Sequence, residues 1–232
     1  MTKFDLIKKV IIKTMPVMAG YIVLGIGFGV LLKVNGYGLF WALIMSIFIY
    51  AGSAQYVGVG LISGGASILT TALTILMVNA RHLFYGISMI NKYKGAGKKK
   101  PYLIFALTDE TYSIVCDGEY PEGVDKYKYW FLISLFNQFY WVLGSVLGSV
   151  IGSIIKFDSK GIDFSMTALF VTVFVEQWLS TKEHRPALIG IGISVLCLLV
   201  FGADRFLIPT MILIVIALFL LRGVIERREK DE

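Results

Sequence analysis

Cysteine is scarce in this sequence, and the little that is present forms no recognisable pattern. Cys116 and Cys197 are the only cysteines among the 232 residues, and neither belongs to a CxxC motif or a Cys/His cluster. We therefore expect neither a disulfide framework nor a zinc site. The first apolar run is long, glycine-rich and without a clear small-residue cleavage site, so we expect it to stay in the chain as a membrane helix rather than be removed as a signal peptide.

Charged residues are absent from a long stretch of the chain. No Asp, Glu, Lys or Arg occurs from Val34 to Ala80. Hydrophobic residues make up 56% of the chain and the mean hydropathy is +0.74, which is more apolar than a water-soluble domain. A helix needs roughly 20 apolar residues to cross the hydrocarbon core of a bilayer, and several such runs fit into this chain. These features exclude an ordinary soluble domain and indicate an integral membrane protein.

Apolar runs separated by short polar segments predict the architecture. The runs are 15–32, 39–63, 66–90, 129–155, 164–180, 187–203 and 206–221, with a shorter one at 101–116. We predict an all-α polytopic membrane protein with about six to eight transmembrane helices, one or two of them broken or re-entrant, in a single domain over 1–232. The short run contains two acids, so we expect a half-helix, a re-entrant segment or a short helix that lines a cavity. Residues 3–13 could form an amphipathic surface helix, and 222–232 a polar tail.

The net charge of +6 comes mainly from lysines and arginines at the ends of apolar runs. Such clusters are typical of cytoplasmic loops, and because they form no basic face we expect no nucleic-acid partner. The segment 92–100 poses a problem, since it would lie outside if 15–32, 39–63 and 66–90 each crossed once from a cytoplasmic N-terminus. Either the bias fails here or one run does not cross fully. The run 39–63 is a candidate, because Gly52-Ser53-Ala54-Gln55 interrupts it.

Glycines recur at one-turn spacing in two of the runs. Gly25 and Gly29 form a pair, and Gly144, Gly148 and Gly152 form a longer stripe. We expect these small residues to let helices pack closely in lipid. A possible internal repeat relates the segment 23–56 to the segment 142–178. Such a repeat would suit a transporter built from two related halves, although two glycine-rich apolar helices can resemble each other by chance.

Arg81 interrupts the apolar run 66–90, beside Asn79, Ala80 and His82. On one continuous helix a polar stripe results, formed by Thr70, Thr74, Met77, Arg81, Tyr85 and Ser88. Counting back from Lys92 places Arg81 roughly 16 Å deep, near the middle of a roughly 30 Å core. A charge at that depth is costly, so it faces a partner or a polar path. Arg81 either pairs with a carboxylate of the protein or binds an anionic group such as a substrate carboxylate.

Other polar groups in the apolar chain are candidates for the same site. Asp109 and Glu110 are the natural countercharges of Arg81, and one of them could carry a proton or bind a substrate ammonium; both could instead lie in water at a helix end. His82 could join a proton relay or simply form a hydrogen bond. Gln55 lies either at a helix break that exposes backbone groups or in an uninterrupted helix as a buried amide.

These polar segments resemble those of a known family. Gly52-Ser53-Ala54-Gln55, Asn79-Ala80-Arg81-His82 and Leu107-Thr108-Asp109-Glu110 occur in an order and spacing similar to the AzlC family of branched-chain amino acid permease large subunits. The resemblance covers nearly the whole chain. It implies export of branched-chain and related amino acids, and a small AzlD-like membrane subunit as partner. It assigns no site residue.

The physical chemistry of a neutral amino acid fits this resemblance. Its carboxylate needs a cation, its ammonium needs an anion or carbonyl oxygens, and its side chain needs an apolar pocket, to which Met77, Phe84 and Phe105 could contribute. The predicted substrate-binding or coupling residues are Gln55, Asn79, Arg81, His82, Asp109 and Glu110. We expect no metal and no cofactor.

We therefore expect a proton-driven exporter in the cytoplasmic membrane. An ion or small-solute channel is one alternative. A structural subunit whose partner carries the substrate site is another. An intramembrane enzyme is not expected, because the sequence contains neither HExxH nor GxSxG.

Overall fold

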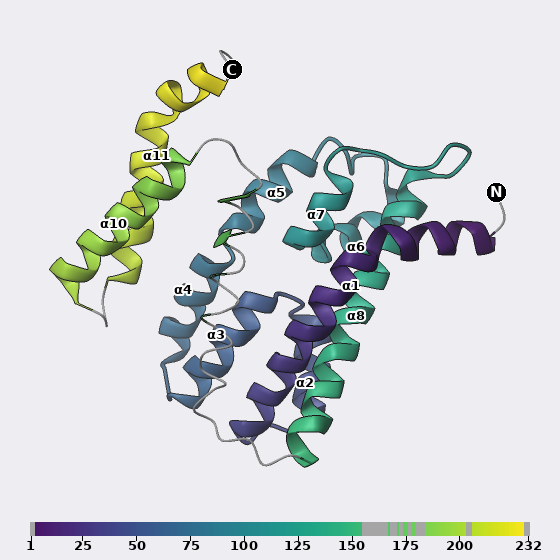
Figure 1. Cartoon of the computed structure of the whole chain (residues 1–232), viewed down its shortest axis with the longest axis horizontal. Helices are drawn as coiled ribbons and strands as arrows, with labels where there is room; N and C mark the ends of the chain where they lie inside the picture. Colours follow the sequence, from purple (N-terminus) through teal and green to yellow (C-terminus); the bar gives the residue numbers. More distant parts are fainter. Residues whose placement is uncertain are drawn as a thin grey trace. The chain divides into compact units, whose positions relative to one another are not determined.

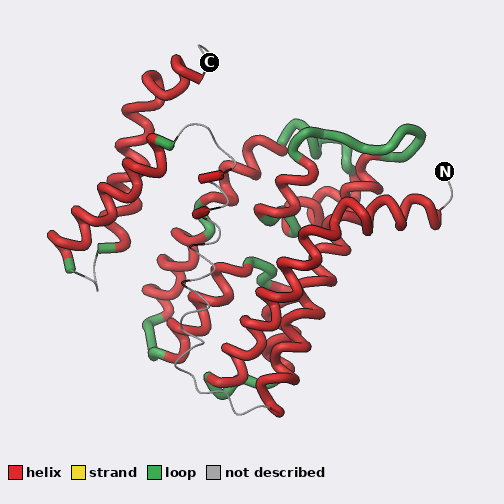
Figure 2. The backbone as a smooth tube through the Cα atoms, in the orientation of Figure 1, coloured by secondary structure: helices red, strands yellow, loops and turns green. Residues whose placement is uncertain are grey.

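The computed structural model describes residues 3–154, 167, 171, 174–175, 178–179, 184–202 and 206–229. Within these residues helices joined by loops are found and no strand, which confirms the all-α prediction (Figure 2). The chain forms two compact units, Met1–Leu169 and Phe170–Glu232. The second half of the possible repeat falls largely outside the described residues, so the repeat remains a prediction.

The first unit contains most of the helices, and they keep the order of the apolar runs (Figure 1). They are α1 (Lys3–Val34), α2 (Leu39–Phe48), α3 (Gly52–Ser63), α4 (Ile68–Val78), α5 (Arg81–Met89), the 3-10 turn η1 (Gly97–Lys99), α6 (Lys100–Phe105), α7 (Asp109–Val115) and α8 (Lys126–Ile154). In the second unit α10 (Arg185–Phe201) packs against α11 (Leu207–Glu229).

Few of the described helices are long enough to cross a membrane. By length and apolarity α1 and α8 qualify, and α4 with α5 forms a third span if the bent pair is counted as one. Shorter apolar helices are Leu39–Phe48, Arg185–Phe201 and Ile212–Leu221. The predicted six to eight spans are therefore not confirmed within the described part of the chain.

Glycine stripes join α1 to α8, as the sequence predicts. A Cβ added to Gly25 would lie 2.9 Å from the backbone nitrogen of Ser145, and one on Gly29 or Gly148 would overlap the backbone of the other helix. Further along, Gly152 lies against Val30 and Lys33. Later residues of α1 contact later residues of α8, so the two helices run parallel.

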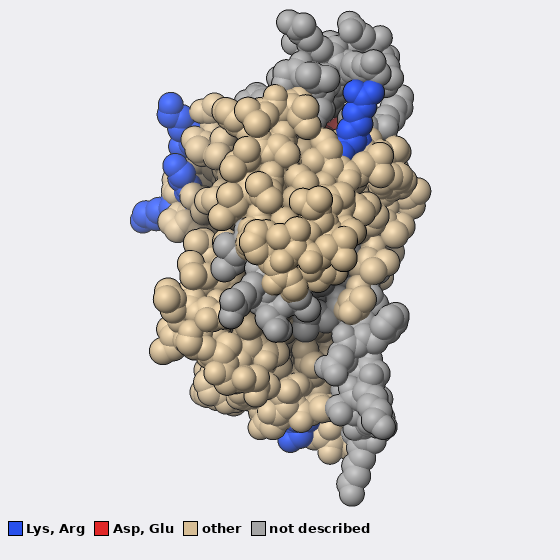
Figure 3. Space-filling model, turned by 90° about the vertical axis from the view of Figure 1, so that its left-hand side faces the viewer, with Lys and Arg blue, Asp and Glu red and all other residues tan. Residues whose placement is uncertain are grey.

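One end of the first unit is rich in lysine, and we call it the Lys-rich end. It comprises the N-terminal turns of α1 and the loops 90–99 and 116–125. Leu6 and Val10 of α1 share a buried cluster there with Tyr93, Leu103 and Val115, and Lys13 Nζ lies 3.8 Å from Glu119 Oε2. Figure 3 shows Lys and Arg atoms at a few separate places on a face that consists mainly of uncharged side chains.

Two helix pairs enter the first unit from its two ends and turn back halfway (Figure 1). From the end opposite the Lys-rich end, α2 rises to residues 49–51 and α3 returns. From the Lys-rich end, α6 descends to residues 106–108 and α7 returns. With 10 and 12 residues, α2 and α3 measure about 15 and 18 Å, half a bilayer core each.

This arrangement places the Lys-rich segment 92–100 within the first unit. Residues 92–100 lie at the same end of the unit as the N-terminal lysines, because α2 and α3 turn back and only the α4–α5 pair returns the chain between α1 and α8. The run 39–63, the candidate for an incomplete crossing, is interrupted at 49–51, and neither α2 nor α3 alone is long enough to span a membrane. The prediction of short helices in 101–116 is confirmed.

One prediction about an individual helix was wrong. Residues 66–90 do not form one continuous helix, because α4 and α5 meet at a break with a bend of 49°; the polar stripe drawn on a straight helix therefore does not exist as one face. Residues 3–13 are helical and form the first turns of α1, which continues through Pro16; whether they lie on a membrane surface stays a prediction. Figure 1 shows α1 changing direction after its first turns, as expected where proline removes a helix hydrogen bond.

Candidate functional site

Three interrupted helix pairs of the first unit meet at one level, which we call the central level. Tyr21 of α1 and Trp141 of α8 mark it, with ring centroids 5.5 Å apart. Along α1, Tyr21 lies about 12 Å from Lys13 and about 18 Å from Lys33. The central level is therefore near the middle of the uncharged part of α1.

The break between α2 and α3 places a turn against α8. Tyr50 takes a positive φ of 44°, which is unusual for a residue other than glycine. A Cβ on Gly52 would lie 3.1 Å from the Trp141 ring, so glycine allows α3 to begin in contact with that ring. The first turn of α3 then carries Ser53 and Gln55 into the interior, where both are buried.

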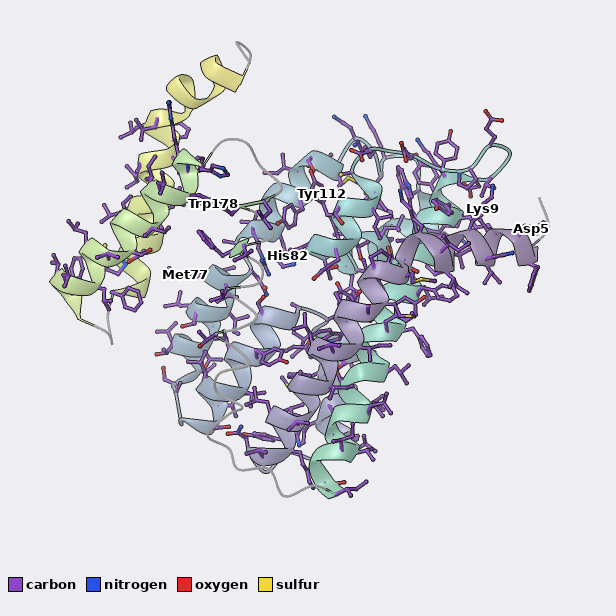
Figure 4. All side chains as sticks on the ribbon, viewed as in Figure 1. Asp5, Lys9, Met77, His82, Tyr112 and Trp178 are labelled. Atoms are coloured by element: carbon purple, nitrogen blue, oxygen red, sulfur yellow. The ribbon has the colours of Figure 1, made fainter. Side chains whose placement is uncertain are left out.

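The break between α4 and α5 sets the position of Arg81. Asn79 ends α4, with its backbone N–H bonded to the carbonyl oxygen of Ile75, and the Ala80 N–H is bonded to that of Met77 before Arg81 begins α5. His82 follows, with Nδ1 3.2 Å from the carbonyl oxygen of Asn79 and its ring beside Tyr85. In Figure 4, Met77 and His82 lie on the two sides of this break.

The break between α6 and α7 presents both acids from one helix turn. Thr108 Oγ1 accepts a hydrogen bond from the Thr111 backbone N–H and so caps α7. Asp109 and Glu110 are consequently the first two residues of α7. Because consecutive helix residues differ by about 100° in direction, their side chains reach different neighbours.

Arg81 joins the three breaks through its guanidinium group. Its Nη1 lies 2.6 Å from Asp109 Oδ2, and its Nη2 donates a hydrogen bond of 2.9 Å to Ser53 Oγ. The two charged side chains are 30% and 24% exposed. In this structure Arg81 is therefore paired with the protein's own carboxylate, one of the two alternatives that the sequence left open.

Glu110 has neutral partners instead. The Tyr21 hydroxyl donates a hydrogen bond of 2.6 Å to Glu110 Oε2, and Thr108 Oγ1 lies 2.6 Å from the same hydroxyl. Among the described residues no ion pair of Glu110 is found. The adjacent acids thus differ in environment, because Asp109 faces a cation on α5 and Glu110 faces hydroxyl groups.

Amide groups complete the interior near the central level. Trp141 Nε1 donates a hydrogen bond of 2.9 Å to Gln55 Oε1, whereas Gln55 Nε2 is buried without a partner among the described residues. Asn137 Nδ2 donates a hydrogen bond of 3.0 Å to Thr111 Oγ1 and so ties α8 to α7. Gln55 is therefore a buried amide at a helix break, which combines the two predicted alternatives.

A largely apolar cavity of about 640 Å³ opens beside the α4–α5 break. Its walls include Asn79 and His82 from the break, Tyr50 from the tip of the α2–α3 pair and Phe105 from α6. Neither Arg81 nor the two acids line it. Of the apolar residues predicted for a substrate pocket, Phe105 does line this cavity and Met77 does not, while the side chain of Phe84 is outside the described part of the structure.

The predicted polar residues are thus brought to one region but into separate environments. Arg81 and Asp109 form an ion pair. Glu110 is bonded to Tyr21 and Gln55 to Trp141. Asn79 and His82 line the cavity. Sequence reasoning missed Tyr21 and Trp141, which lie in apolar runs as ordinary aromatic residues. Their hydrogen-bond partners are distant in sequence, so no local signal marks them.

Comparison with known proteins gives a consistent result. The AzlC protein family model matches residues 16–155. The branched-chain amino acid transport protein AzlC of Bacillus subtilis is 44% identical over 216 residues, covering 93% of this chain and 85% of that protein. A membrane protein of Haemophilus influenzae is 42% identical over 200 residues, covering 86% and 82%. The inner membrane protein YgaZ of Escherichia coli is 25% identical over 203 residues, also covering 86% and 82%. No solved structure was found to match.

Proposed function

The chain belongs to the AzlC family, and on this basis we propose that it is a secondary transporter subunit that exports branched-chain and related neutral amino acids across the cytoplasmic membrane. We propose that export is coupled to protons and that a small AzlD-like membrane subunit acts with it. The B. subtilis relative is named as a branched-chain amino acid transport protein, which supports the substrate class.

The observation that carries the proposal is the ion pair at the central level. Arg81 and Asp109 meet at two helix breaks, where α5 and α7 begin, at the level where the α2–α3 and α6–α7 pairs turn back. Charges and broken helices at mid-membrane depth are typical of transporter substrate sites, because the breaks free backbone N–H and C=O groups for a ligand. A subunit with a purely structural role has no need for this combination.

The groups at the central level suit a zwitterion. The N-termini of α3 and α5 both lie at this level, and the partial positive charge of a helix N-terminus favours an anion such as the substrate carboxylate. Arg81 is occupied by Asp109 in this structure, so a substrate carboxylate would bind it when that pair opens. The cavity lined by Phe105 and neighbouring aliphatic residues would take the hydrocarbon side chain.

For the orientation in the membrane, we propose that the Lys-rich end is cytoplasmic. This end carries the lysines of the N-terminal turns and of 92–100, which agrees with the positive-inside bias. Within the first unit α1, the α4–α5 pair and α8 would then cross the membrane, while α2–α3 and α6–α7 would enter from opposite sides without crossing. The AzlD-like partner rests on the family resemblance alone.

Counterflow in proteoliposomes tests the proposal. Vesicles with the purified chain, alone and with an AzlD-like subunit, are loaded with unlabelled leucine and given labelled leucine, valine, methionine or glutamate outside at controlled pH. We expect saturable uptake of the first three and little of glutamate. Arg81→Ala should lose this uptake while still reaching the membrane.

Three outcomes would contradict the proposal in different ways. A flux that does not saturate and needs no internal substrate would indicate a channel. Normal counterflow by Arg81→Ala would remove Arg81 from the transport mechanism. If only the small subunit binds labelled leucine, the chain is a structural subunit, the remaining alternative.

A further inference from the structure

Asp109 and Glu110 are adjacent acids, but their partners differ in one chemical property. Arg81 carries only N–H donors and keeps its charge at any physiological pH. Asp109 can accept the Arg81 hydrogen bond and also neutralise its positive charge only when Asp109 is a carboxylate. If Asp109 took up a proton, the ion pair of 2.6 Å would be lost and Arg81 would remain as an unpaired charge.

Glu110 is bonded to a group that can serve both protonation states. A tyrosine hydroxyl donates one hydrogen bond and accepts others. Tyr21, whose oxygen lies 2.6 Å from Glu110 Oε2, therefore donates to Glu110 when Glu110 is a carboxylate and can accept from it when it is a carboxylic acid. Thr108, 2.6 Å from the Tyr21 oxygen, can reverse its own hydroxyl in the same step.

In the described part of the chain, the ionisable groups around Glu110 include no cation that competes for it. Tyr21 faces it from α1, Tyr50 from the tip of the α2–α3 pair and Tyr85 from α5. Asp109 precedes it on α7, and the charge of Arg81 on α5 is directed to Asp109. The α8 residue that is hydrogen-bonded to α7 is Asn137, which carries no charge. A proton can thus arrive or leave without the loss of an ion pair.

Glu110 is linked by contacts to helix pairs that enter from both ends of the unit. It lies on the tip of the helix pair that enters from the Lys-rich end. The hydroxyl it binds belongs to Tyr21, whose ring also contacts Tyr50 on the tip of the opposite pair, with centroids 6.4 Å apart. A shift of either pair changes what surrounds this carboxyl.

We propose that Glu110 is the carboxyl that takes up and releases the coupled proton, while Asp109 stays bound to Arg81. This inference rests on the proposed proton-coupled transport. In each cycle one O–H bond forms on Glu110 with a proton from the proton-rich side and breaks again on the other side. No other bond changes, and the amino acid moves in the opposite direction.

The decisive variant is Glu110→Gln, which keeps an acceptor for Tyr21 but cannot exchange a proton. In proteoliposomes, transport of labelled leucine driven by a pH gradient should fall by at least about tenfold. Leucine counterflow without a gradient should continue and should no longer depend on pH between 5.5 and 8. Glu122→Gln, the same change at an exposed loop position, should behave as wild type in both assays.

Asp109→Asn is the comparison on the neighbouring acid, and it should lose counterflow as well as gradient-driven transport because it breaks the ion pair. The proposal is overturned if Glu110→Gln keeps gradient-driven transport, or if it elutes as folded protein on size exclusion and yet loses counterflow as completely as Asp109→Asn. Absence of counterflow in the wild type would reject the proposed function instead, so the two failures are distinguishable.

Discussion

Arg81 and Asp109, on α5 and α7, form an ion pair of 2.6 Å in the interior of the first unit. Each begins its helix, and each helix follows a break. The contact therefore holds together two points where the backbone is interrupted, and Ser53 adds the third. The pair stabilises the helix breaks as well as the charges.

We expect removal of one partner to cost more than removal of both. Asp109→Asn leaves a cation with 30% exposure and no countercharge. The loss of stability should be about 1 to 3 kcal/mol, between the values for exposed and for buried pairs. In the double variant Arg81→Gln/Asp109→Asn part of this loss should return. Thermal unfolding in detergent measures it, and strictly additive effects would show that the two charges are not coupled.

Glycine contacts between α1 and α8 predict a sharp difference between two alanine variants. Gly148→Ala places a methyl group where the backbone of Ile26 lies, whereas a Cβ on Gly20 has no heavy atom within 4 Å. Both changes raise helix propensity by about 1 kcal/mol, so the second serves as a control. We expect Gly148→Ala to lower the melting temperature or yield aggregates, and Gly20→Ala to melt at or slightly above wild type. Equal melting temperatures would contradict the close approach of the two backbones.

The turned-back helix pairs predict a labelling pattern. In a background with Cys116 and Cys197 replaced by serine, single cysteines are introduced at the exposed positions Lys8, Lys98, Asn35 and Ser63. A membrane-impermeant thiol reagent should reach Lys8→Cys and Lys98→Cys from one side, and Asn35→Cys and Ser63→Cys from the other. Labelling of Ser63→Cys from the same side as Lys98→Cys would mean that α2 and α3 together cross the membrane.

The loop before α8 gives a prediction for acid. Lys99 Nζ lies 2.8 Å from Asp125 Oδ2 and holds the pKa of that carboxyl below its ordinary value. A lowered pKa in the folded protein means that the contribution is present above the unfolded pKa of about 3.9 and is lost as the pH falls through the lower folded value. At pH 7, Asp125→Asn should cost about 0.5 kcal/mol, as for other exposed pairs. The difference in stability between Asp125→Asn and wild type should shrink below about pH 4. If the difference persists there, the loss of stability comes from another contact of Asp125.

The sequence identified the polar groups better than the shape of their helices. The interruption at Gly52 was predictable, because glycine and polar residues stand together in an apolar run. The break after Val78 was not, since Asn79-Ala80-Arg81 is compatible with a continuous helix. There the chain bends where Arg81 meets Ser53 and Asp109, and contacts with distant residues leave no trace in local periodicity. The same reason hides Tyr21, whose partner Glu110 is far along the chain.

The parallel contact of α1 with α8 has a consequence for biosynthesis. The glycine face of α1 is made first, but its partner emerges only after the whole of α2 to α7 has been synthesised. Until then the short helices α2, α3, α6 and α7 cannot pack against α8. The backbone N–H and C=O groups at their ends would be unpaired in lipid, which is unfavourable. We therefore expect the α2–α3 and α6–α7 pairs to reach their final positions late, after α8 has been inserted. A ribosome-bound chain that stops before residue 126 should accordingly be far more sensitive to protease than one that includes α8.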